Sequence, residues 1–229
     1  MTDQRPHIVQ LIYSFDLEQR GGGVEQFGIA LSQALDPEQF KVSLCGLWQF
    51  GTPFEQQRVQ RLNQMGIHAF TAAPWREESP SGSLRQAIQG LQAYLAQNPC
   101  RAVHSHSEFG DLAALGLKLS RRAPRIFRTV HYGYRVEWRK RPLRRYLFTH
   151  LLYPLLFDGE FGVSREIVST LNRRPLARLL RRQARVLNNA VDLSRFANLA
   201  ADCRRKRLEL GLSPDSFLIG SVGRLTEQK

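Results

Sequence analysis

Short apolar runs alternate along this chain with longer stretches in which apolar residues recur every three or four positions. The short runs have the length of buried strands, and the longer stretches have the spacing of amphipathic helices. We predict strands at residues 7–13, 40–47, 102–106, 125–131, 160–163 and 185–187. We predict helices at residues 24–35, 54–65, 84–97 and 112–119, and one capped by Ser164. This alternation is typical of a doubly wound parallel sheet, so the fold class is α/β and Rossmann-like.

The last part of the sequence has a different pattern. Residues 192–213 are polar and carry a short helical segment, and the apolar run at 217–222 has the character of one more buried strand. We therefore expect an amino-terminal domain over residues 1–195, a linker over 196–215, and the first strand and loop of a second domain over 216–229.

The composition is that of a globular protein. The 229 residues are 42% hydrophobic, which is enough for an ordinary core. Residues 1–6 are polar and the apolar run at 151–157 is too short to span a bilayer, so we expect a cytoplasmic location. Cys45, Cys100 and Cys203 are odd in number and widely spaced, which indicates reduced thiols rather than disulfides or a zinc site.

The formal net charge of +13 predicts an anionic partner, and most of it comes from arginines between residues 121 and 207. Nucleic acid, an anionic membrane and a phosphorylated small molecule all fit this charge. Residues 139–157 alternate cations with aromatic and aliphatic side chains, which fits either peripheral membrane contact or a solvated basic face over a core-packing helix. A cluster of arginines favours phosphate-rich material: Arg173, Arg174, Arg178, Arg181 and Arg182.

A glycine turn, Gly21 to Gly23, joins the first predicted strand to the first predicted helix. It lacks the glycine that a dinucleotide fingerprint needs, because Gln26 stands at that position, and it lacks the Gly-Lys-Ser/Thr of a P-loop. Bare backbone at the positive end of a helix lets a ligand approach the N–H groups. A tight turn without a ligand is the alternative.

Two predicted strands end in histidines. His104 and His106 lie two residues apart and share a face, and His131 ends the next strand. The carboxyl ends of parallel strands are where open sheets bind ligands. With Glu108, these histidines resemble the H-x-H sites of metal hydrolases, but the chain lacks the eight strand–helix units of those barrels, so we expect no metal and assign the histidines to hydrogen bonding.

Two other motifs are excluded as sites. Asp158 belongs to no D-x-D sequence and precedes a predicted strand, which places it away from the expected crevice. The segment around Ser164 lacks the last glycine of a nucleophile elbow, because Glu166 stands there.

Beyond the run at 217–222, Arg224 and Lys229 stand five positions apart and can present fixed positive charge to a phosphate.

Taken together, the chain resembles the amino-terminal half of the GT-B fold glycosyltransferases of family 4. The resemblance covers essentially the whole length, and the order and spacing of its marks make it specific. The marks are the segments 22–25 (GGVE), 103–106 (VHSH), 129–131 (TVH), 162–164 (GVS), 188–192 (NNAVD) with Phe196, and 220–225 (GSVGRL).

This resemblance implies transfer of a sugar, of hexosyltransferase type, from a nucleotide sugar to an acceptor, with retention of configuration and without a metal or other cofactor. It assigns His131 to the transferred sugar, as the catalytic residue. The other implied residues are Arg224, Lys229 and Gly23 at the donor diphosphate, and Gly22, His106 and Glu108 in the acceptor crevice. The acceptor is a lipid-linked saccharide, a polysaccharide or a small sugar.

The sequence departs from the family pattern in two places. Ala190 occupies the glycine position of the usual N-G-V-D turn. The carboxyl-terminal domain that in the family carries the nucleotide pocket and an E-x7-E pair does not follow, so we expect a truncated chain that is inactive by itself. The alternatives to a glycosyltransferase are a non-catalytic sugar- or polyanion-binding module and a sugar-nucleotide epimerase. Nucleic-acid binding is disfavoured because the sequence contains no recognisable nucleic-acid-binding module.

Overall fold

The computed structural model describes residues 4–19, 22–132, 146–190, 200–213 and 216–220. The chain divides into two compact units, Met1–Asn189 and Ala190–Lys229. Each unit is considered by itself.

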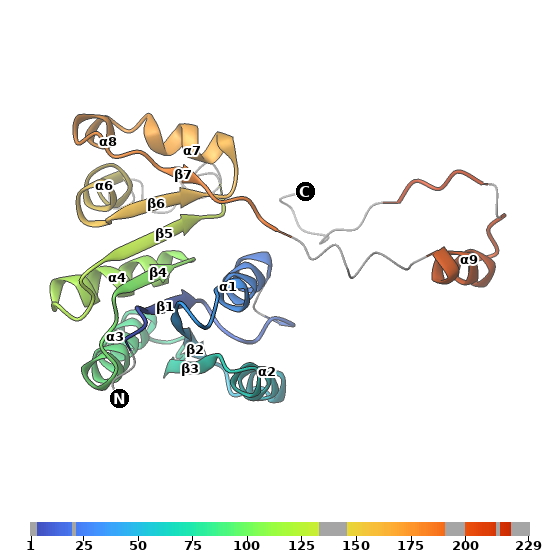
Figure 1. Ribbon diagram of the computed structural model, residues 1–229, viewed down its shortest axis with the longest axis horizontal. Helices are drawn as coiled ribbons and strands as arrows, with labels where there is room; N and C mark the ends of the chain where they lie inside the picture. Colours follow the sequence, from blue (N-terminus) through green and yellow to red (C-terminus); the bar gives the residue numbers. More distant parts are fainter. Residues whose placement is uncertain (1–3, 20–21, 133–145, 191–199, 214–215, 221–229) are drawn as a thin grey trace. The chain divides into compact units, whose positions relative to one another are not determined.

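The first unit is built on a seven-stranded parallel sheet in the order β3-β2-β1-β4-β5-β6-β7 (Figure 1). Strand β1 pairs with β2 on one side and with β4 on the other, both in parallel register, and the strand order reverses between β1 and β4. The predicted Rossmann-like fold is therefore confirmed. The strands are β1 (His7–Ile12), β2 (Lys41–Gln49), β3 (His68–Pro74), β4 (Ala102–Ser105), β5 (Ile126–Val130), β6 (Gly159–Gly162) and β7 (Arg185–Val186).

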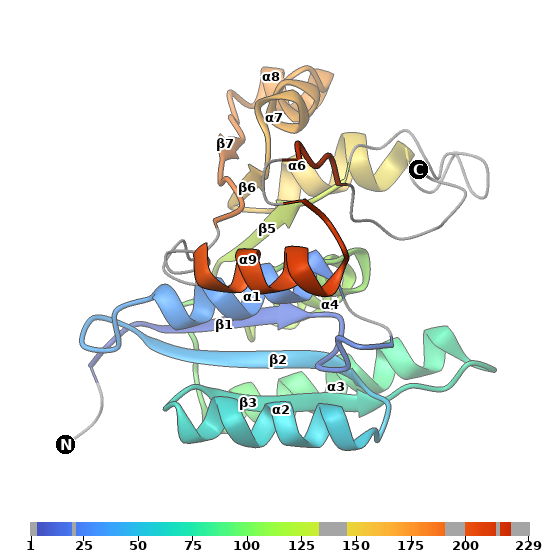
Figure 2. The ribbon, with the colours of Figure 1, turned by 90° about the vertical axis from the view of Figure 1, so that its right-hand side faces the viewer.

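Helices cover both faces of the sheet (Figure 1, Figure 2). Alternate residues of a strand point to opposite faces, so Leu11 and Cys45 join the core with α3 and α4, while Ile12 and Leu44 join the core with α1 and α2. The helices of this unit are α1 (Gly23–Ala34), α2 (Pro53–Gln64), α3 (Pro80–Gln97), α4 (Glu108–Leu119), the π-helical η1 (Phe148–Leu152), α6 (Tyr153–Leu156), α7 (Arg165–Asn172) and α8 (Pro175–Leu179).

Several helices begin where the sequence predicts. The hydroxyl of Ser164 accepts the N–H of Ile167 at 3.3 Å, which confirms this serine as the cap of α7. Helix α4 begins earlier than the predicted residues 112–119, at Glu108, because Ser107 caps it through the N–H of Gly110. Asp158 has a structural role, as predicted, because its carboxylate accepts the backbone N–H of Ile126 at 2.9 Å at the start of β5.

A buried ionic network lies between the sheet and the helices α4 and α6. Arg128 of β5 contacts the carboxylate of Asp111 at 2.8 Å and that of Glu160 at 3.6 Å, and its guanidinium lies 3.9 Å from the ring centre of Tyr153. Arg174 pairs with Glu160 from the other side. Two cations and two carboxylates thus neutralise one another in a water-poor site, which makes the network fragile to the loss of any member.

The structure corrects three sequence predictions. Strand β3 was not expected, because its small residues give a weak strand pattern, yet its backbone completes the edge of the sheet beside β2. Helix α8, a short segment after Pro175, was also missed. Residues 217–220, the described part of the strand expected at 217–222, form no strand, because the second unit has no described strand of its own with which they could pair.

The second unit contains α9 (Ala200–Glu209), the short helix expected between residues 192 and 213. After Gly211, Phe217 and Ile219 are largely exposed to solvent. The proposed domain limits stay a prediction. Among the described residues, no helix combines the length and apolar character needed to cross a membrane.

Candidate functional site

The candidate site lies where β1, β4 and β5 end side by side. Helix α1 follows β1, His106 follows β4 and His131 follows β5. The sheet order places these three strand ends next to one another, beside the reversal of strand order. This is the part of an open parallel sheet where loops leave a crevice for ligands.

Three histidines gather at this edge. The ring centres of His104 and His106 are 4.3 Å apart, and those of His106 and His131 are 5.8 Å apart. Phe27 of α1 packs edge-on against His106 at 5.6 Å and against His131 at 5.0 Å. The aromatic side chain therefore joins the first helix to both strand-end histidines.

Hydrogen bonds fix the two deeper rings. His104 Nε2 lies 2.8 Å from the hydroxyl of Thr129, and His106 Nε2 lies 2.8 Å from Oε1 of Gln10. With that amide oxygen as the acceptor, His106 carries its proton on Nε2. His106 Nδ1 and His131 Nε2 are buried and make no hydrogen bond to any described residue. Two ring nitrogens of the cluster are thus left for a hydrogen-bonding ligand.

Burial keeps these histidines neutral. Desolvation lowers the pKa of His104 to about 3 and that of His131 to about 4, and it lowers the pKa of His106 well below its ordinary value. The neighbouring histidines add to the effect for His104 and His106. At neutral pH the cluster offers hydrogen-bond donors and acceptors rather than positive charge. Within the described ranges, no group of three or more His, Cys, Asp or Glu side chains is arranged to hold a metal ion.

The glycine turn lies at the start of α1. The N–H of Gly22 donates to the carboxylate of Glu25 at 2.7 Å, so this donor is already used within the helix end. A methyl group at Gly23 would meet no atom within 4 Å, so packing does not require glycine there and its surroundings are open. A ligand anion at this turn would find Gly23 more accessible than Gly22.

A second glycine permits the site to form. A methyl group added at Gly28 would lie 2.5 Å from Ile12 Cγ2 and 3.4 Å from His106 Cδ2. The glycine therefore lets α1 pack directly on the end of β1 and on His106.

Glu108, the first residue of α4, lies at the same edge of the sheet and is exposed. Arg224 and Lys229 lie outside the described residues.

An aromatic cluster closes the core beside the histidines. The rings of Tyr13, Trp75 and Phe109 pack around Trp48, with centre-to-centre distances to Trp48 of 5.1 Å for Trp75 and 5.5 Å for Phe109, and Phe50 packs against Tyr13 and Trp75. Trp48 is fully buried. These rings continue the core formed with α3 and α4, so packed side chains fill the space on the α3 and α4 side of the strand ends.

The sequence model of Glycosyltransferase Family 4 matches residues 21–195, more than half of the chain. The chain belongs to glycosyltransferase family 4. The histidine cluster, α1 and the glycine turn all fall within the matched residues. The resemblance to GT-B glycosyltransferases stated from the sequence is confirmed, and no match was found among curated proteins.

Solved structures share the fold of this family 4 chain. A glycosyltransferase from Rickettsia africae ESF-5 superposes with a TM-score of 0.63 at 14% identity, over 93% of this chain and 51% of that one. The Anabaena protein HepE in complex with UDP and glucose superposes with a TM-score of 0.60 at 16% identity, over 90% of this chain and 50% of that one. The chain spans about half the length of these structures.

Three residues of the family 4 site were not singled out by the sequence analysis. Phe27 was assigned only to the apolar face of its helix, and Thr129 only to its strand and to the family segment 129–131, without a role of its own. Gln10 carried a usable signal, because it is the polar residue in an otherwise apolar strand interior and is buried. A buried amide must find a partner, which predicts a polar neighbour at that point of the sheet.

We expect this family 4 domain to lose stability steeply on acidification. The three histidines have lower pKa values folded than unfolded, so the stability they preserve is complete above about pH 6.5 and is lost as the pH falls toward 4. Each proton taken up only on unfolding contributes about 1.4 kcal/mol per pH unit. Asp111 acts in the opposite direction, because burial raises its folded pKa to about 6 and its contribution is lost as the pH rises through that value.

The expected net slope is about 2–3 kcal/mol per pH unit between pH values of about 6 and 4.5. The measurement is the free energy of unfolding from urea titrations across that range. His104→Gln removes one titrating group and should lower the slope by about 1.4 kcal/mol per pH unit. A free energy of unfolding that is flat across the range would contradict the burial of these rings.

Proposed function

We propose that this chain is the acceptor-side half of a glycosyltransferase that moves a sugar from a nucleotide sugar to a saccharide or lipid-linked acceptor. The observation that carries the proposal is the neutral histidine cluster at the ends of β4 and β5, packed on α1 inside the residues that match the family. Neutral imidazoles bind sugar hydroxyls without attracting a competing anion into the acceptor crevice.

The donor class is proposed from the similar structures. HepE was crystallised with UDP and glucose and with UDP-glucose. Breaking the bond between sugar and diphosphate develops negative charge on the leaving group, and fixed cations stabilise that charge more than they stabilise the bound donor. We assign this role to Arg224 and Lys229, with Arg224 supplying a planar guanidinium fork.

His131 is the proposed catalytic residue. It ends β5, contacts Phe27, and has a buried Nε2 without a described hydrogen-bond partner. In our proposal this nitrogen hydrogen-bonds the sugar being transferred, while His106, Glu108 and Gly22 border the acceptor and Gly23 approaches the donor phosphate. The reaction retains the configuration of the sugar and uses no metal.

An epimerase acting on a nucleotide sugar is the second candidate. A putative UDP-N-acetylglucosamine 2-epimerase from Listeria monocytogenes superposes with a TM-score of 0.52 at 14% identity, over 73% of this chain and 42% of that one. Product analysis with and without an acceptor separates the two functions. An epimerised nucleotide sugar formed without acceptor would favour the epimerase.

Peripheral contact with the inner face of a membrane through residues 139–157 is part of the proposal. Residues 139–145 lie outside the described ranges. In the described part, Leu147, Leu151 and Leu155 recur every four residues and are all exposed. A row of exposed leucines on one helical face suits the boundary between headgroups and acyl chains of a bilayer.

We expect the 229-residue chain by itself to release no measurable nucleotide from a panel of nucleotide sugars. Correct orientation of two substrates and closure of two domains supply much of the rate of such enzymes. The measurement compares this chain with a version extended through any continuing reading frame that contains E-x7-E, and the short chain should reach less than about one hundredth of the longer chain's rate.

Equal turnover by the two chains would show that the domain assignment is wrong. The absence of turnover by both, together with binding of a saccharide to the short chain, would favour the non-catalytic binding module.

A further inference from the structure

Two helices of the first unit end in the same way. Helix α4 ends in Leu-Ser-Arg-Arg at residues 119–122, and α8 ends in Leu-Leu-Arg-Arg at residues 179–182. The N–H of Arg121 donates to the carbonyl of Lys118 at 3.0 Å, and the N–H of Arg122 donates to that of Leu117 at 2.9 Å. At the end of α8, the N–H of Arg181 donates to the carbonyl of Arg178 at 3.0 Å, and the N–H of Arg182 donates to that of Ala177 at 2.9 Å. Both ends are Schellman motifs.

The first arginine of each pair occupies a position that favours glycine. Arg121 has a φ of 58° and Arg181 a φ of 53°, and they are the non-glycine residues with positive φ among those described. The same position at the ends of α2 and α9 is filled by Gly66 and Gly211. A side chain with a Cβ is disfavoured there. The two arginines therefore occupy these positions at a cost to the local backbone.

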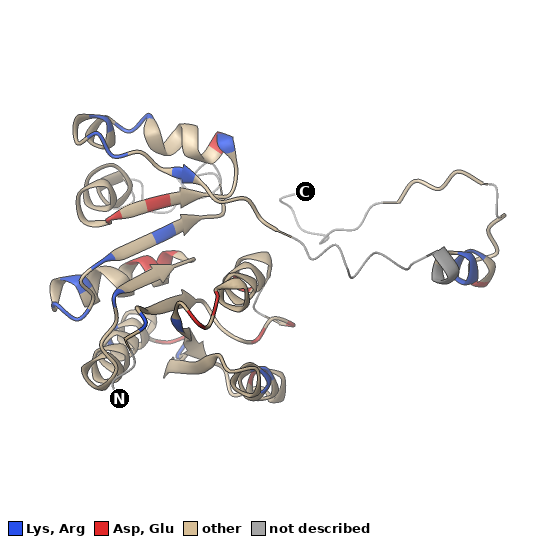
Figure 3. Cartoon of the chain, viewed as in Figure 1, with Lys and Arg blue, Asp and Glu red and all other residues tan. Residues whose placement is uncertain are grey.

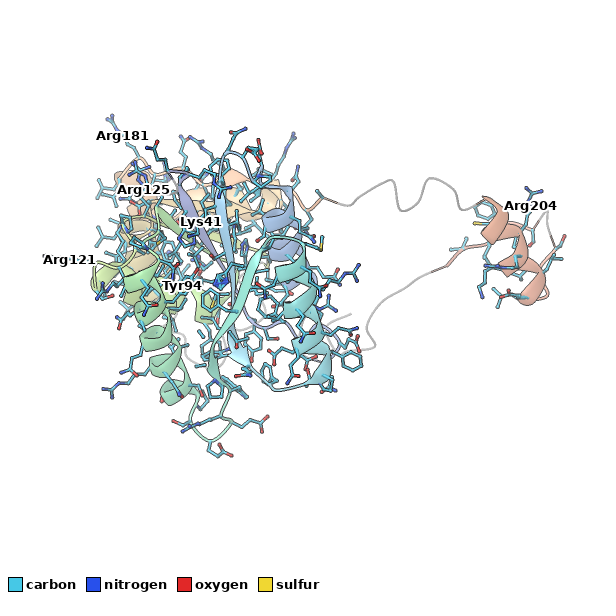
Figure 4. The ribbon with its side chains drawn as sticks, turned by 60° about the horizontal axis from the view of Figure 1, so that its bottom comes forward. Lys41, Tyr94, Arg121, Arg125, Arg181 and Arg204 are labelled. Carbon is cyan, nitrogen blue, oxygen red and sulfur yellow. The ribbon has the colours of Figure 1, made fainter. Side chains whose placement is uncertain are left out.

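Both motifs lie at the amino edge of the sheet, opposite the histidine cluster. The residues Arg121 and Arg122 lead into β5, and Arg181 and Arg182 lead into β7. In Figure 3 the loops that precede these two strands contain Lys and Arg positions, coloured blue, and Figure 4 shows Arg121, Arg125 and Arg181 on one side of the unit.

The loops that enter β4, β5, β6 and β7 carry a net positive charge. Their carboxylate is Asp158, which is paired with Lys118. Their arginines are Arg101, Arg121, Arg122, Arg125, Arg181 and Arg182.

Apolar side chains stand among these cations. Leu119 is 73% exposed and Leu179 is 78% exposed, each at the last residue of its helix and two positions before the arginine with positive φ. Exposed leucines interspersed with arginines combine the two properties that bind a protein to an anionic bilayer, since arginine attracts headgroup phosphates and leucine enters the acyl boundary.

We propose that this amino edge is a docking surface for an anionic phospholipid bilayer. We define the surface by Leu119, Arg121, Arg122 and Arg125 of the α4 end and by Leu179, Arg181 and Arg182 of the α8 end. A nucleic acid would use the arginines but would gain nothing from the two leucines, whereas a bilayer uses both. Docking by this edge leaves the histidine cluster facing the aqueous phase. The inference is independent of the transfer reaction.

The decisive variant is Arg121→Gly with Arg181→Gly in the full chain. Glycine suits both backbone positions, so the melting temperature should stay equal or rise while two surface charges are lost. Each cation near an anionic surface strengthens binding about fivefold, so we expect partition onto mixed phosphatidylglycerol–phosphatidylcholine vesicles at low salt to fall about 30-fold. Leu119→Gln with Leu179→Gln should lower it at least about tenfold.

The matched control is Arg61→Gln with Arg85→Gln, which removes the same charge from exposed positions on α2 and α3. It should change partition less than about twofold. Vesicles of pure phosphatidylcholine should not bind the chain.

Three outcomes would overturn the proposal. The first is unchanged vesicle binding by the double glycine variant. The second is unchanged binding by the double leucine variant together with tight binding of a DNA duplex, which would assign the arginines to a polyanion in solution. The third is binding that survives in the glycine variant but is lost in Leu147→Gln with Leu151→Gln, which would assign membrane contact to residues 139–157 alone.

Discussion

Replacing His131 with alanine is expected to lower turnover by about 10²–10³-fold in a protein that joins this chain to a donor-binding domain. The ring is held by Phe27 at the carboxyl edge, and its buried Nε2 is the proposed contact to the transferred sugar. A hydrogen bond made more strongly in the transition state than in the bound substrate changes kcat rather than KM. The measurement is steady-state nucleotide release together with thermal melting.

His68→Ala provides the matched control. His68 begins β3, at the opposite edge of the sheet, and is exposed. Its removal should leave kcat unchanged. If His131→Ala instead kept full turnover and melted at the temperature of the unchanged protein, His131 would have only a packing role and the site assignment would fail.

Replacing Arg128 with methionine is expected to lower the free energy of unfolding by about 3–5 kcal/mol. The guanidinium contacts Asp111 at 2.8 Å and Glu160 at 3.6 Å, and all three side chains are buried. Methionine has similar bulk but leaves Asp111 without its cation, and it leaves Glu160 with Arg174 alone. The measurement is urea unfolding at neutral pH.

Arg125→Met removes the same charge one residue before β5, where the side chain is exposed, and should change the free energy of unfolding by less than about 0.5 kcal/mol. Lower pH should soften the effect of Arg128→Met, because the uncompensated Asp111 then binds a proton more readily. A loss below about 1 kcal/mol at neutral pH would mean that water reaches the network and screens its charges.

The opposite edges of the sheet carry contrasting chemistry. The carboxyl edge holds neutral imidazoles in a buried cluster, and the amino edge of β4 to β7 holds exposed arginines and leucines. In our proposals the first edge handles the sugar, and the second edge, in addition to residues 139–157, places the domain at a membrane. Because the two sets of residues do not overlap, variants of one edge leave the other intact, and the two proposals fail or succeed separately.

The sequence by itself determined the strand–helix order and the fold class, because those depend on local patterns. Runs such as residues 7–13 bury apolar side chains on both faces of the sheet. The spacing of apolar residues after Gly23 predicts a helix independently of the rest of the chain. The sequence also predicts where strands end, and this alone places His106 and His131 at the same edge of the sheet. The same local logic predicted a strand at 217–222, whose described part, residues 217–220, forms none.

Only the tertiary structure decided which side chains meet. Gln10 and His106 are hydrogen-bonded across 96 residues of sequence, and Phe27 reaches both His106 and His131 because Gly28 lets α1 approach. Arg128 appeared in the sequence as one more cation, yet β5 points it into the core between Asp111 and Glu160. The positive φ of Arg121 and Arg181 is likewise set by how each helix must end to enter the next strand. Such contacts depend on the packing of distant elements, which no local pattern records.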